Sequence, residues 1–439
     1  MSLQVWLPLV TDLQNRGLST ISRIYAENLV FGSGGKLGFC MSGYTGYFAV
    51  PSMTGCKQMS VAYWVKVNTA TEENWLDAFR WYSTDGTTVQ SSRNEFYTNS
   101  TLTGFWYAGS PNSISGKPNV VGEWRHHVFT IDYAAGTASF YINGELVGSS
   151  DGVNTDHYLT GTDFMIGESG LDTSHNDFRL YDHVLSLREI HELSKGLMAH
   201  WKLDEEIDGA DLLPEYPNWE YNVIHDASGY CHDGVMSETP PVYVSDSVRY
   251  RKCLQFNAAD HTYIDCGIDT WLPTDQITVA WWGYMTNWGS YGQAISCTQS
   301  GGWNFEPLSG KMAFPVYKTN AYIRASSEAS LSELSSGWHF FAGVFDGYVS
   351  KLYIDGGLVA TSDNDATVLG KIYYRPTVKL LIGCEPDTAT PTTPYFNGKL
   401  SDIRIYATAL SEDDIMELYS VSASIDNRHN VYAREFVEV

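Results

Sequence analysis

A nine-residue stretch that occurs twice decides the fold of this chain. Residues 124–132 read WRHHVFTID, and residues 338–346 read WHFFAGVFD. Each copy is followed by a strong hairpin signal, Asn143-Gly144 in the first case and Asp355-Gly356 in the second. Both dipeptides suit a type I′ turn, because that turn requires a positive φ at both central residues. The sequence therefore predicts a long strand and a tight hairpin in each half of the chain.

The repeat continues to the end of each half. Residues 178–190 (FRLYDHVLSLREI) align without a gap with residues 403–415 (IRIYATALSEDDI). In each segment an alternating strand leads to a serine, Ser186 or Ser411, with an acidic residue three positions later. This spacing is a capping box, which opens a helix. Each half is therefore expected to be a series of short strands closed by one small amphipathic helix.

Length and composition support a two-domain, all-β chain. A length of 439 residues exceeds what one core usually holds, so we expect one domain over residues 1–196, a second over 197–421, and a tail over 422–439. The aromatic share of 14% favours strands. The net charge of −24 would repel phosphates and anionic lipid surfaces, so nucleic acid is not an expected partner. No apolar run is long enough to predict membrane insertion.

Further matched segments carry a family resemblance. Trp6 and Trp201 open the two halves, and Val61–Trp64 (VAYW) corresponds to Val279–Trp282 (VAWW). Together with the hairpins and the strand-to-helix endings, these segments resemble the laminin G-like jelly rolls of the concanavalin A-like lectin/glucanase superfamily. The resemblance implies two tandem β-sandwich jelly rolls, each with a short C-terminal helix. It does not fix the function, because members of this fold include glycan-binding modules, protein-binding modules and glucanases.

The two ends of the chain carry a second resemblance. Residues 3–9 (LQVWLPL) and 423–436 (ASIDNRHNVYAREF) are similar to the ends of laminin G-like proteins encoded among phage and prophage structural genes. This likeness implies a virion component with other virion proteins as partners, and a docking role for the tail. The start of the sequence lacks the basic and apolar regions of a signal peptide, which agrees with release by lysis.

Aromatic side chains provide the candidate glycan-binding residues. Sugar rings stack on exposed aromatic rings through their apolar C–H faces. Trp288 and Tyr291 lie in a segment with loop composition, where a ring is harder to bury. The candidates in the first half are Trp75, Trp81, Tyr82 and Trp106. A packed position in the core is the alternative interpretation of each ring.

The spacing of carboxylates and histidines in the sequence matches no catalytic pattern. Glucanases of this fold carry carboxylates on alternate residues of one strand, which point together into the cleft. The nearest run, residues 206–211 (EIDGAD), contains a glycine and ends in aspartate, so a solvated loop is expected there. His126 and His127 are adjacent in a predicted strand and face opposite sides, so they cannot readily chelate one ion. No catalytic residue is predicted.

Calcium is a second candidate ligand, because this fold often holds an ion in acidic loops at one rim. Oxygen-rich, turn-prone segments supply the candidate ligands Asp226, Asp233, Asp363 and Asp365. Ordinary turns are the alternative interpretation of these segments.

The sequence thus predicts a non-enzymatic adhesin that binds host cell-surface carbohydrate as a fibre, tail or baseplate component of a phage virion. A structural virion module that binds another protein and a glycoside hydrolase are the alternatives. A homo-oligomer is expected, since weak sugar sites gain avidity when several copies are displayed together.

Overall fold

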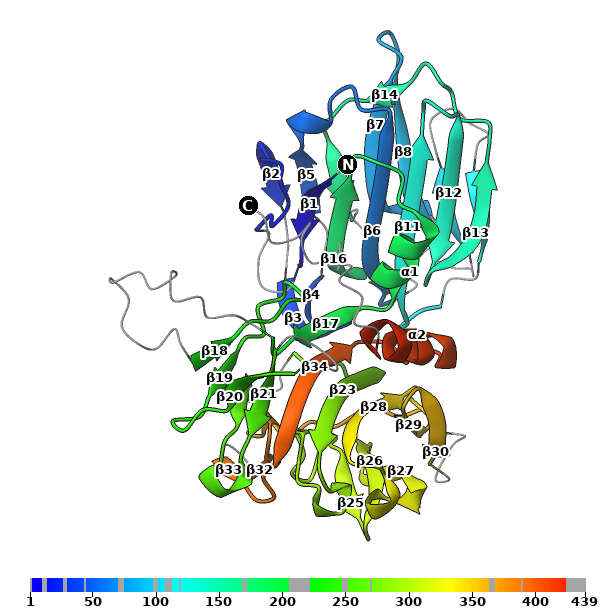
Figure 1. Cartoon of the computed structure of the whole chain (residues 1–439). Helices are drawn as coiled ribbons and strands as arrows, with labels where there is room; N and C mark the ends of the chain where they lie inside the picture. Colours follow the sequence, from blue (N-terminus) through cyan, green and yellow to red (C-terminus); the bar gives the residue numbers. More distant parts are fainter. Residues whose placement is uncertain are drawn as a thin grey trace, which may run out of the picture. The chain divides into compact units, whose positions relative to one another are not determined.

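A computed structural model describes most of the chain. The described residues are 2–9, 14–26, 30–42, 45–69, 75–97, 102–106, 113–117, 120–167, 172–204, 222–246, 252–268, 271–362, 368–387 and 390–423. They form two compact units, Met1–Gly196 and Leu197–Glu438, here called domain 1 and domain 2 (Figure 1). Strands dominate both units, which confirms the expected all-β fold of two jelly rolls.

Domain 1 consists of two antiparallel sheets, described here in strand order. The first sheet runs β13 (Glu145–Ser150), β12 (Thr137–Ile142), β11 (Trp124–Asp132), β6 (Gln58–Val67), β16 (Thr173–Tyr181), β4 (Gly38–Ser42) and β3 (Val30–Gly35), with β1 (Leu3–Leu7) also on β16. The second runs β10 (Ser113–Lys117), β9 (Leu102–Trp106), β8 (Val89–Tyr97), β7 (Trp75–Thr84), β15 (Phe164–Ile166), β5 (Thr45–Ala49) and β2 (Arg23–Ala26), with β14 (Tyr158–Leu159) on β7.

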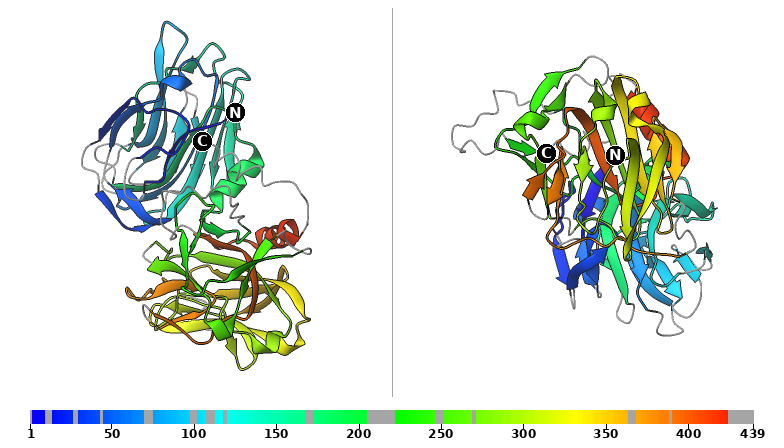
Figure 2. Two further views of the ribbon diagram at one scale, coloured as in Figure 1. Left: turned by 60° about the vertical axis from the view of Figure 1, so that its left-hand side comes forward. Right: turned by 90° about the horizontal axis from the view of Figure 1, so that it is seen from below.

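Domain 2 has one large sheet with the same arrangement as the first sheet of domain 1, and three smaller sheets in place of the second. Its large sheet runs β20 (Val242–Ser245), β21 (Lys252–Phe256), β34 (Gly398–Tyr406), β23 (Ile277–Met285), β28 (Gly337–Phe345), β29 (Ser350–Ile354) and β30 (Gly357–Thr361), with β17 (Leu197–Trp201) on β34. The smaller sheets are β18 (Val223–Ile224), β19 (Gly234–Met236), β22 (Ile264–Ile268), β31 (Lys379–Ile382) and β24 (Ile295–Ser296); β25 (Glu306–Leu308), β26 (Lys311–Lys318) and β27 (Ala321–Ser330); and β32 (Glu385–Asp387) with β33 (Thr390–Thr392). Two further views show these layers within each domain (Figure 2).

The repeated nine-residue stretch forms the predicted strand in both domains, as β11 and β28. The hairpins that follow adopt the expected backbone, with φ of 52° at Asn143 and 50° at Asp355, and with a positive φ at the glycine after each. The Asn143 carboxamide accepts a hydrogen bond from the backbone N–H of His126, and the Asp355 carboxylate accepts the same bond from Phe340. Turn chemistry therefore sets the same strand register twice.

The predicted capping boxes are also confirmed. Helix α1 (Leu187–Ser194) begins after Ser186, whose hydroxyl accepts from the N–H of Glu189 while the Glu189 carboxylate accepts from the N–H of Ser186. Helix α2 (Glu412–Ala423) begins after Ser411, which makes the same pair of bonds with Asp414. Neither helix is long and apolar enough to cross a membrane. The predicted docking tail lies outside the described residues from 424 onward.

The opening strands differ from the sequence alignment by one residue. Trp6 of β1 lies opposite Arg179, whereas the residue opposite Arg404 in domain 2 is His200 rather than Trp201. Trp6 Nε1 donates to a buried aspartate, Asp177, at 2.7 Å, and His200 makes the corresponding 2.7 Å contact with Asp402. The pairing of Trp6 with Trp201 is therefore wrong: both opening strands carry a bulge at the same place, and the residues at equivalent positions are Trp6 and His200, each in contact with a buried aspartate.

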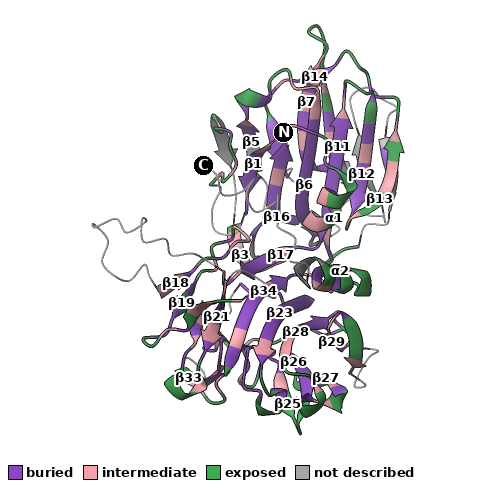
Figure 3. Cartoon of the chain, viewed as in Figure 1, coloured by how far each residue is buried: buried purple, intermediate pink, exposed green. Residues whose placement is uncertain are grey.

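The spaces between the sheets are closely packed in both domains but differ in polarity. The buried residues follow the middle of the strands, and the exposed residues lie mainly in the connections (Figure 3). In domain 1, the hydroxyl of Tyr63 donates to the buried Asn94 at 2.6 Å, and His127 Nδ1 approaches the same oxygen at 3.2 Å. In domain 2, the corresponding pair is Trp281 and Phe341, whose rings stack 4.5 Å apart.

Candidate functional site

The aromatic residues predicted to contact sugar in domain 2 are buried. Trp288 is 1% exposed and Tyr291 is 6% exposed. The indole of Trp288 lies 5.0 Å from the ring of Phe341, and the hydroxyl of Tyr291 donates to the carbonyl of Phe305. The expectation that a ring in this loop would be exposed is therefore wrong, because a short 3-10 turn, Trp288–Ser290, directs the indole into the core.

The domain 1 candidates give a similar result where they are described. Trp81 is fully buried between the sheets, with its ring 5.5 Å from that of Phe79. Tyr82, its neighbour on β7, is half-buried. The side chains of Trp75 and Trp106 lie outside the described residues, although their backbones belong to β7 and β9. Tyr82 is thus the candidate ring whose described side chain is partly open to solvent.

The candidate calcium ligand Asp226 organises a loop. Its carboxylate accepts hydrogen bonds from the backbone N–H groups of His200, Ser228 and His232 at 2.8–3.1 Å, and from the Ser228 hydroxyl at 2.6 Å. Asp233 accepts from the N–H of Asp226 at 2.8 Å. These bonds occupy the oxygens that calcium would require. Asp363 and Asp365 lie outside the described residues, and no described group of three or more acidic, histidine or cysteine side chains could hold a metal.

A cluster of polar side chains lies in domain 2 beside the three-stranded sheet of β25, β26 and β27, with Glu306 and Arg324 on the outer face of that sheet. Strand alternation explains this, because Phe305 packs inward against Phe314 with ring centroids 4.9 Å apart, so that Glu306 on β25 must face outward. Arg324 on β27 donates from Nε to Glu306 at 3.1 Å. Glu385 on β32 accepts a hydrogen bond from the side chain of Gln293. We call Gln293, Asn304, Glu306, Arg324 and Glu385 the carboxylate–amide cluster.

The electrostatics of the cluster are unusual for a surface. Partial burial and the neighbouring charge of Glu306 raise the pKa of Glu385. Gln293 and Asn304 are only 2% and 1% exposed, and among the described residues their side-chain oxygens have no hydrogen-bond partner. A buried acceptor without a donor costs about 1–3 kcal/mol, and an ordered water is a common partner for such an atom. A carboxyl with a raised pKa beside a second carboxylate marks a candidate binding site.

Carboxylate spacing along a single strand could not predict this cluster. Glu306 and Glu385 come from strands of two different sheets that are far apart in the sequence. The glucanase-like run of residues 206–211 lies outside the described residues. The alternation of Asn304, Phe305 and Glu306 was the one available signal, since it predicts two polar side chains on the face opposite a buried ring.

Comparison with known families agrees with this architecture. The model of the laminin G-type family within the concanavalin A-like lectin/glucanases superfamily matches residues 42–191 and 257–416. The chain belongs to this superfamily. The family resemblance seen in the sequence is thereby confirmed in both halves, whereas the likeness to phage proteins stays a prediction. No curated protein matches the chain.

Solved structures with similar folds were also found. Domain 4 of AbnA, an extracellular arabinanase of Geobacillus stearothermophilus solved with arabinotriose, is 15% identical, with 51% of this chain and 98% of that chain covered and a TM-score of 0.32. Trypanosoma rangeli sialidase is 15% identical, with 44% and 32% covered and a TM-score of 0.32. The binding domain of botulinum neurotoxin DC in complex with SialylT is 12% identical, with 95% and 97% covered and a TM-score of 0.37. These identities are too low to transfer a ligand from any of them.

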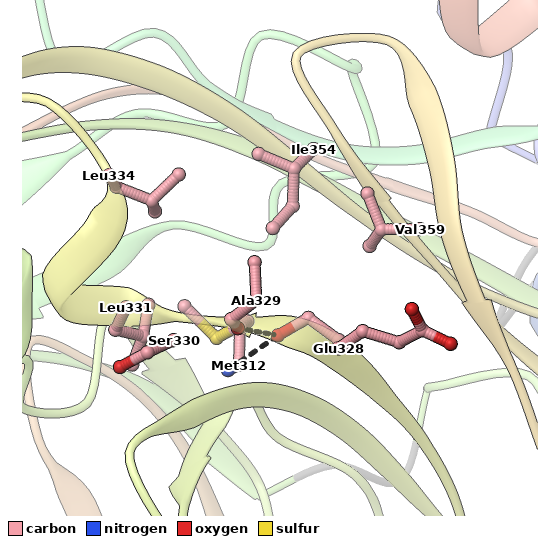
Figure 4. A pocket seen from close by; sticks show the side chains of 9 residues that line it. Met312, Glu328, Ala329, Ser330, Leu331, Leu334, Ile354 and Val359 are labelled. Carbon is pink, nitrogen blue, oxygen red and sulfur yellow. Dashed lines mark hydrogen bonds between the residues drawn. The ribbon is translucent and has the colours of Figure 1, made fainter.

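This superfamily member also has a groove of about 340 Å³ in domain 2, away from the cluster residues. In Figure 4, Leu334, Ile354 and Val359 lie across the space from Met312, Ala329 and Ser330. The Ser327 hydroxyl accepts from the N–H of Met312 and donates to the carbonyl of Ala329, so it is already engaged. The lining residues are Met312, Ser327, Glu328, Ala329, Ser330, Leu331, Leu334, Ile354 and Val359, and none is aromatic.

A histidine joins two segments that border one side of this groove. His339 Nδ1 lies 2.7 Å from the Asp355 carboxylate, next to Ile354, and Nε2 lies 3.1 Å from the carbonyl of Ser335, next to Leu334. Both partners are acceptors, so both ring nitrogens must carry a proton to satisfy them. The hydrogen bond to Asp355 accordingly raises the pKa of His339. The imidazole therefore acts as a positively charged link rather than as a general base.

Proposed function

We propose that the chain is a carbohydrate-binding protein and that the carboxylate–amide cluster is its glycan site. The observation that carries this proposal is the pair of partly exposed carboxylates of Glu306 and Glu385 beside the guanidinium of Arg324. Sugar hydroxyls are donors spaced along a ring, and they match a group of convergent acceptors. The ring of Tyr322, which lies under the Arg324 guanidinium at 5.0 Å, supplies an adjacent apolar surface.

The proposal extends to the biological setting. The likeness of the two chain ends to phage structural proteins supports a role as a fibre, tail or baseplate component that recognises carbohydrate on a bacterial host. Other virion proteins would then be its partners. Display of several copies would multiply weak sugar contacts, so a homo-oligomer suits this role.

A glycoside hydrolase is the second candidate, and the same cluster favours it. Burial and Glu306 raise the pKa of Glu385, as a general acid requires, and Glu306, which is paired with Arg324, is a second carboxylate nearby. We prefer binding without hydrolysis because the Glu306 carboxylate, which would have to act as base or nucleophile, already accepts a hydrogen bond from Arg324 Nε. The superfamily includes both lectins and glucanases, so release of sugar must be measured together with binding.

The test uses the full chain against a panel of neutral, acidic and amine-bearing bacterial surface polysaccharides, with reducing sugar assayed in parallel. We expect saturable binding without release, and at least ~10-fold weaker binding for Glu306→Gln and Glu385→Gln, since each removes a charged acceptor. Glu328→Gln, which alters an exposed carboxylate in the groove, is the matched control.

Each outcome has a distinct meaning. Equal loss in the control variant would assign binding to another surface. Absence of binding to every polysaccharide would overturn the proposed function and favour a module that binds another virion protein. Release of reducing sugar that stops in Glu385→Gln would establish the hydrolase instead.

A further inference from the structure

The groove of domain 2 has the position that an isoleucine fills in domain 1. It lies between β27 and β30, and the corresponding strands of domain 1, β10 and β13, contact each other. There Ile114 is buried over Gly148, where an added Cβ would meet the isoleucine at 2.7 Å. In the strand pairing, Ala360 of β30 stands at the position of Gly148. The isoleucine contact therefore cannot be repeated in domain 2, and the space is open to an aliphatic side chain from elsewhere.

Two strand edges border this groove. Among the described strands, β27 is the last of its three-stranded sheet and β30 is the last of the large sheet. A strand edge can pair with a further extended segment, and the neighbouring side chains then decide which segment fits. Those side chains are apolar at Leu334, Ile354 and Val359, and Val359 is 36% exposed. Glu328 lies below Val359 in Figure 4 and forms no ion pair with another described residue. The groove therefore suits an extended segment with aliphatic side chains and one cation.

The tail of the chain has this chemistry and can reach the groove. Residues 431–439 read VYAREFVEV, in which apolar, strand-forming side chains surround a single arginine. The tail follows α2, which packs on the turn between β29 and β30, where a Cβ on Gly356 would lie 3.0 Å from the ring of Tyr419. Residues 424–430 span roughly 20 Å when extended. The strand from Gly356 to Val359 covers only about 10 Å, so the tail is long enough to enter the groove of its own domain.

We propose that residues 431–439 bind in the groove of their own chain as an extended segment, with an aliphatic side chain in the position of Ile114 and with Arg434 paired with Glu328. Because α2 tethers the segment, its effective concentration at the groove is on the order of mM, which favours it over the tail of a second copy. A glycan is a poorer occupant, since no aromatic ring lines the groove. The groove is separate from the carboxylate–amide cluster, so this inference does not depend on the proposed function.

Hydrogen exchange on the full chain, followed by mass spectrometry, tests this contact. We expect the amides of residues 431–439 to exchange at least ~10-fold more slowly than those of a free peptide of residues 424–439. Val359→Asp places a charge in the groove and should return the tail to the exchange rate of the free peptide. Leu308→Asp is the matched control and should keep the protection, because Leu308 on β25 is 40% exposed and does not line the groove. Equal thermal unfolding of the two variants shows that the fold is intact in both.

A charge exchange tests the ion pair separately. Glu328→Arg should speed the exchange of the tail, and adding Arg434→Glu should restore the slow rate. Failure of the double variant to restore it would overturn the pairing of Arg434 with Glu328. Exchange of the parent tail at the rate of the free peptide would overturn the docking, and so would protection that survives Val359→Asp. Protection that disappears on dilution would assign the groove to the tail of a second copy and overturn the same-chain arrangement.

Discussion

The two domains share a strand register but fill the space between their sheets with different chemistry. Tyr63 and His127 of domain 1 correspond to Trp281 and Phe341 of domain 2, because each pair lies directly opposite on neighbouring strands. His175 corresponds in the same way to the buried Leu400. The register is therefore set by turns and backbone pairing, whereas the polarity of the core can vary between copies.

The domains also differ at the open side of the sandwich. In domain 1, Ile114 of β10 packs closely over Gly148 of β13, where even an added Cβ would meet the isoleucine at 2.7 Å. In domain 2, the corresponding strands, β27 and β30, border the groove. In domain 1, the contact between Gly148 and Ile114 leaves little space between these two strands. In domain 2, the space between the equivalent strands is open as the groove.

The largest expected effect comes from breaking the aromatic core of domain 2. Trp288→Ala should lower the free energy of unfolding of this domain by about 3–5 kcal/mol, because it leaves a cavity beside Phe341 and Tyr291. Urea unfolding of the full chain, followed by hydrogen exchange to locate the transition, measures this loss.

Tyr348→Ala is the control for that substitution, since its ring is 42% exposed and little stability should be lost. If Trp288→Ala instead left stability unchanged and weakened glycan binding, the indole would have to be exposed in solution, and the buried placement would be wrong.

The sequence allowed much of the fold to be predicted and little of the site. Local chemistry fixes the hairpins at Asn143 and Asp355 and the helix starts at Ser186 and Ser411, and each requires only neighbouring residues. The burial of Trp288 could not be predicted, because loop composition does not reveal what packs against a loop. The carboxylate–amide cluster depends on sheet topology, which brings together strands that no local spacing connects.

The next largest expected effect is a loss of stability in acid that affects the core of domain 1 and not that of domain 2. Burial lowers the pKa of His175 to about 3, so in the folded state the imidazole stays neutral while the unfolded chain takes up a proton below about pH 6.5. Stability contributed by this position is therefore lost as the pH falls. His175→Leu, which introduces the residue found in domain 2, should remove about 2 kcal/mol of the loss between pH 8 and pH 5.

The free energy of unfolding of domain 1 is measured as a function of pH for both proteins. Comparing how it changes with pH, rather than its value at one pH, removes any constant effect of the substitution. His225→Gln serves as the control, because this imidazole is 73% exposed and its replacement should leave the domain 1 slope unchanged. An unchanged slope in His175→Leu would show that acid sensitivity does not arise from this buried histidine.

The smallest expected effect has the opposite sign and lies in domain 2. The hydrogen bond to Asp355 raises the pKa of His339, so its stabilising link is complete below about pH 6.5 and is lost as the pH rises through the folded-state value. The groups around the ring are the Asp355 carboxylate, the Ser335 carbonyl and the edge of Trp288. His339→Gln should cost about 1 kcal/mol at pH 5 and much less at pH 9. Urea unfolding at the two pH values measures the difference, and an equal cost at both would mean that His339 bonds to Asp355 and Ser335 as a neutral side chain.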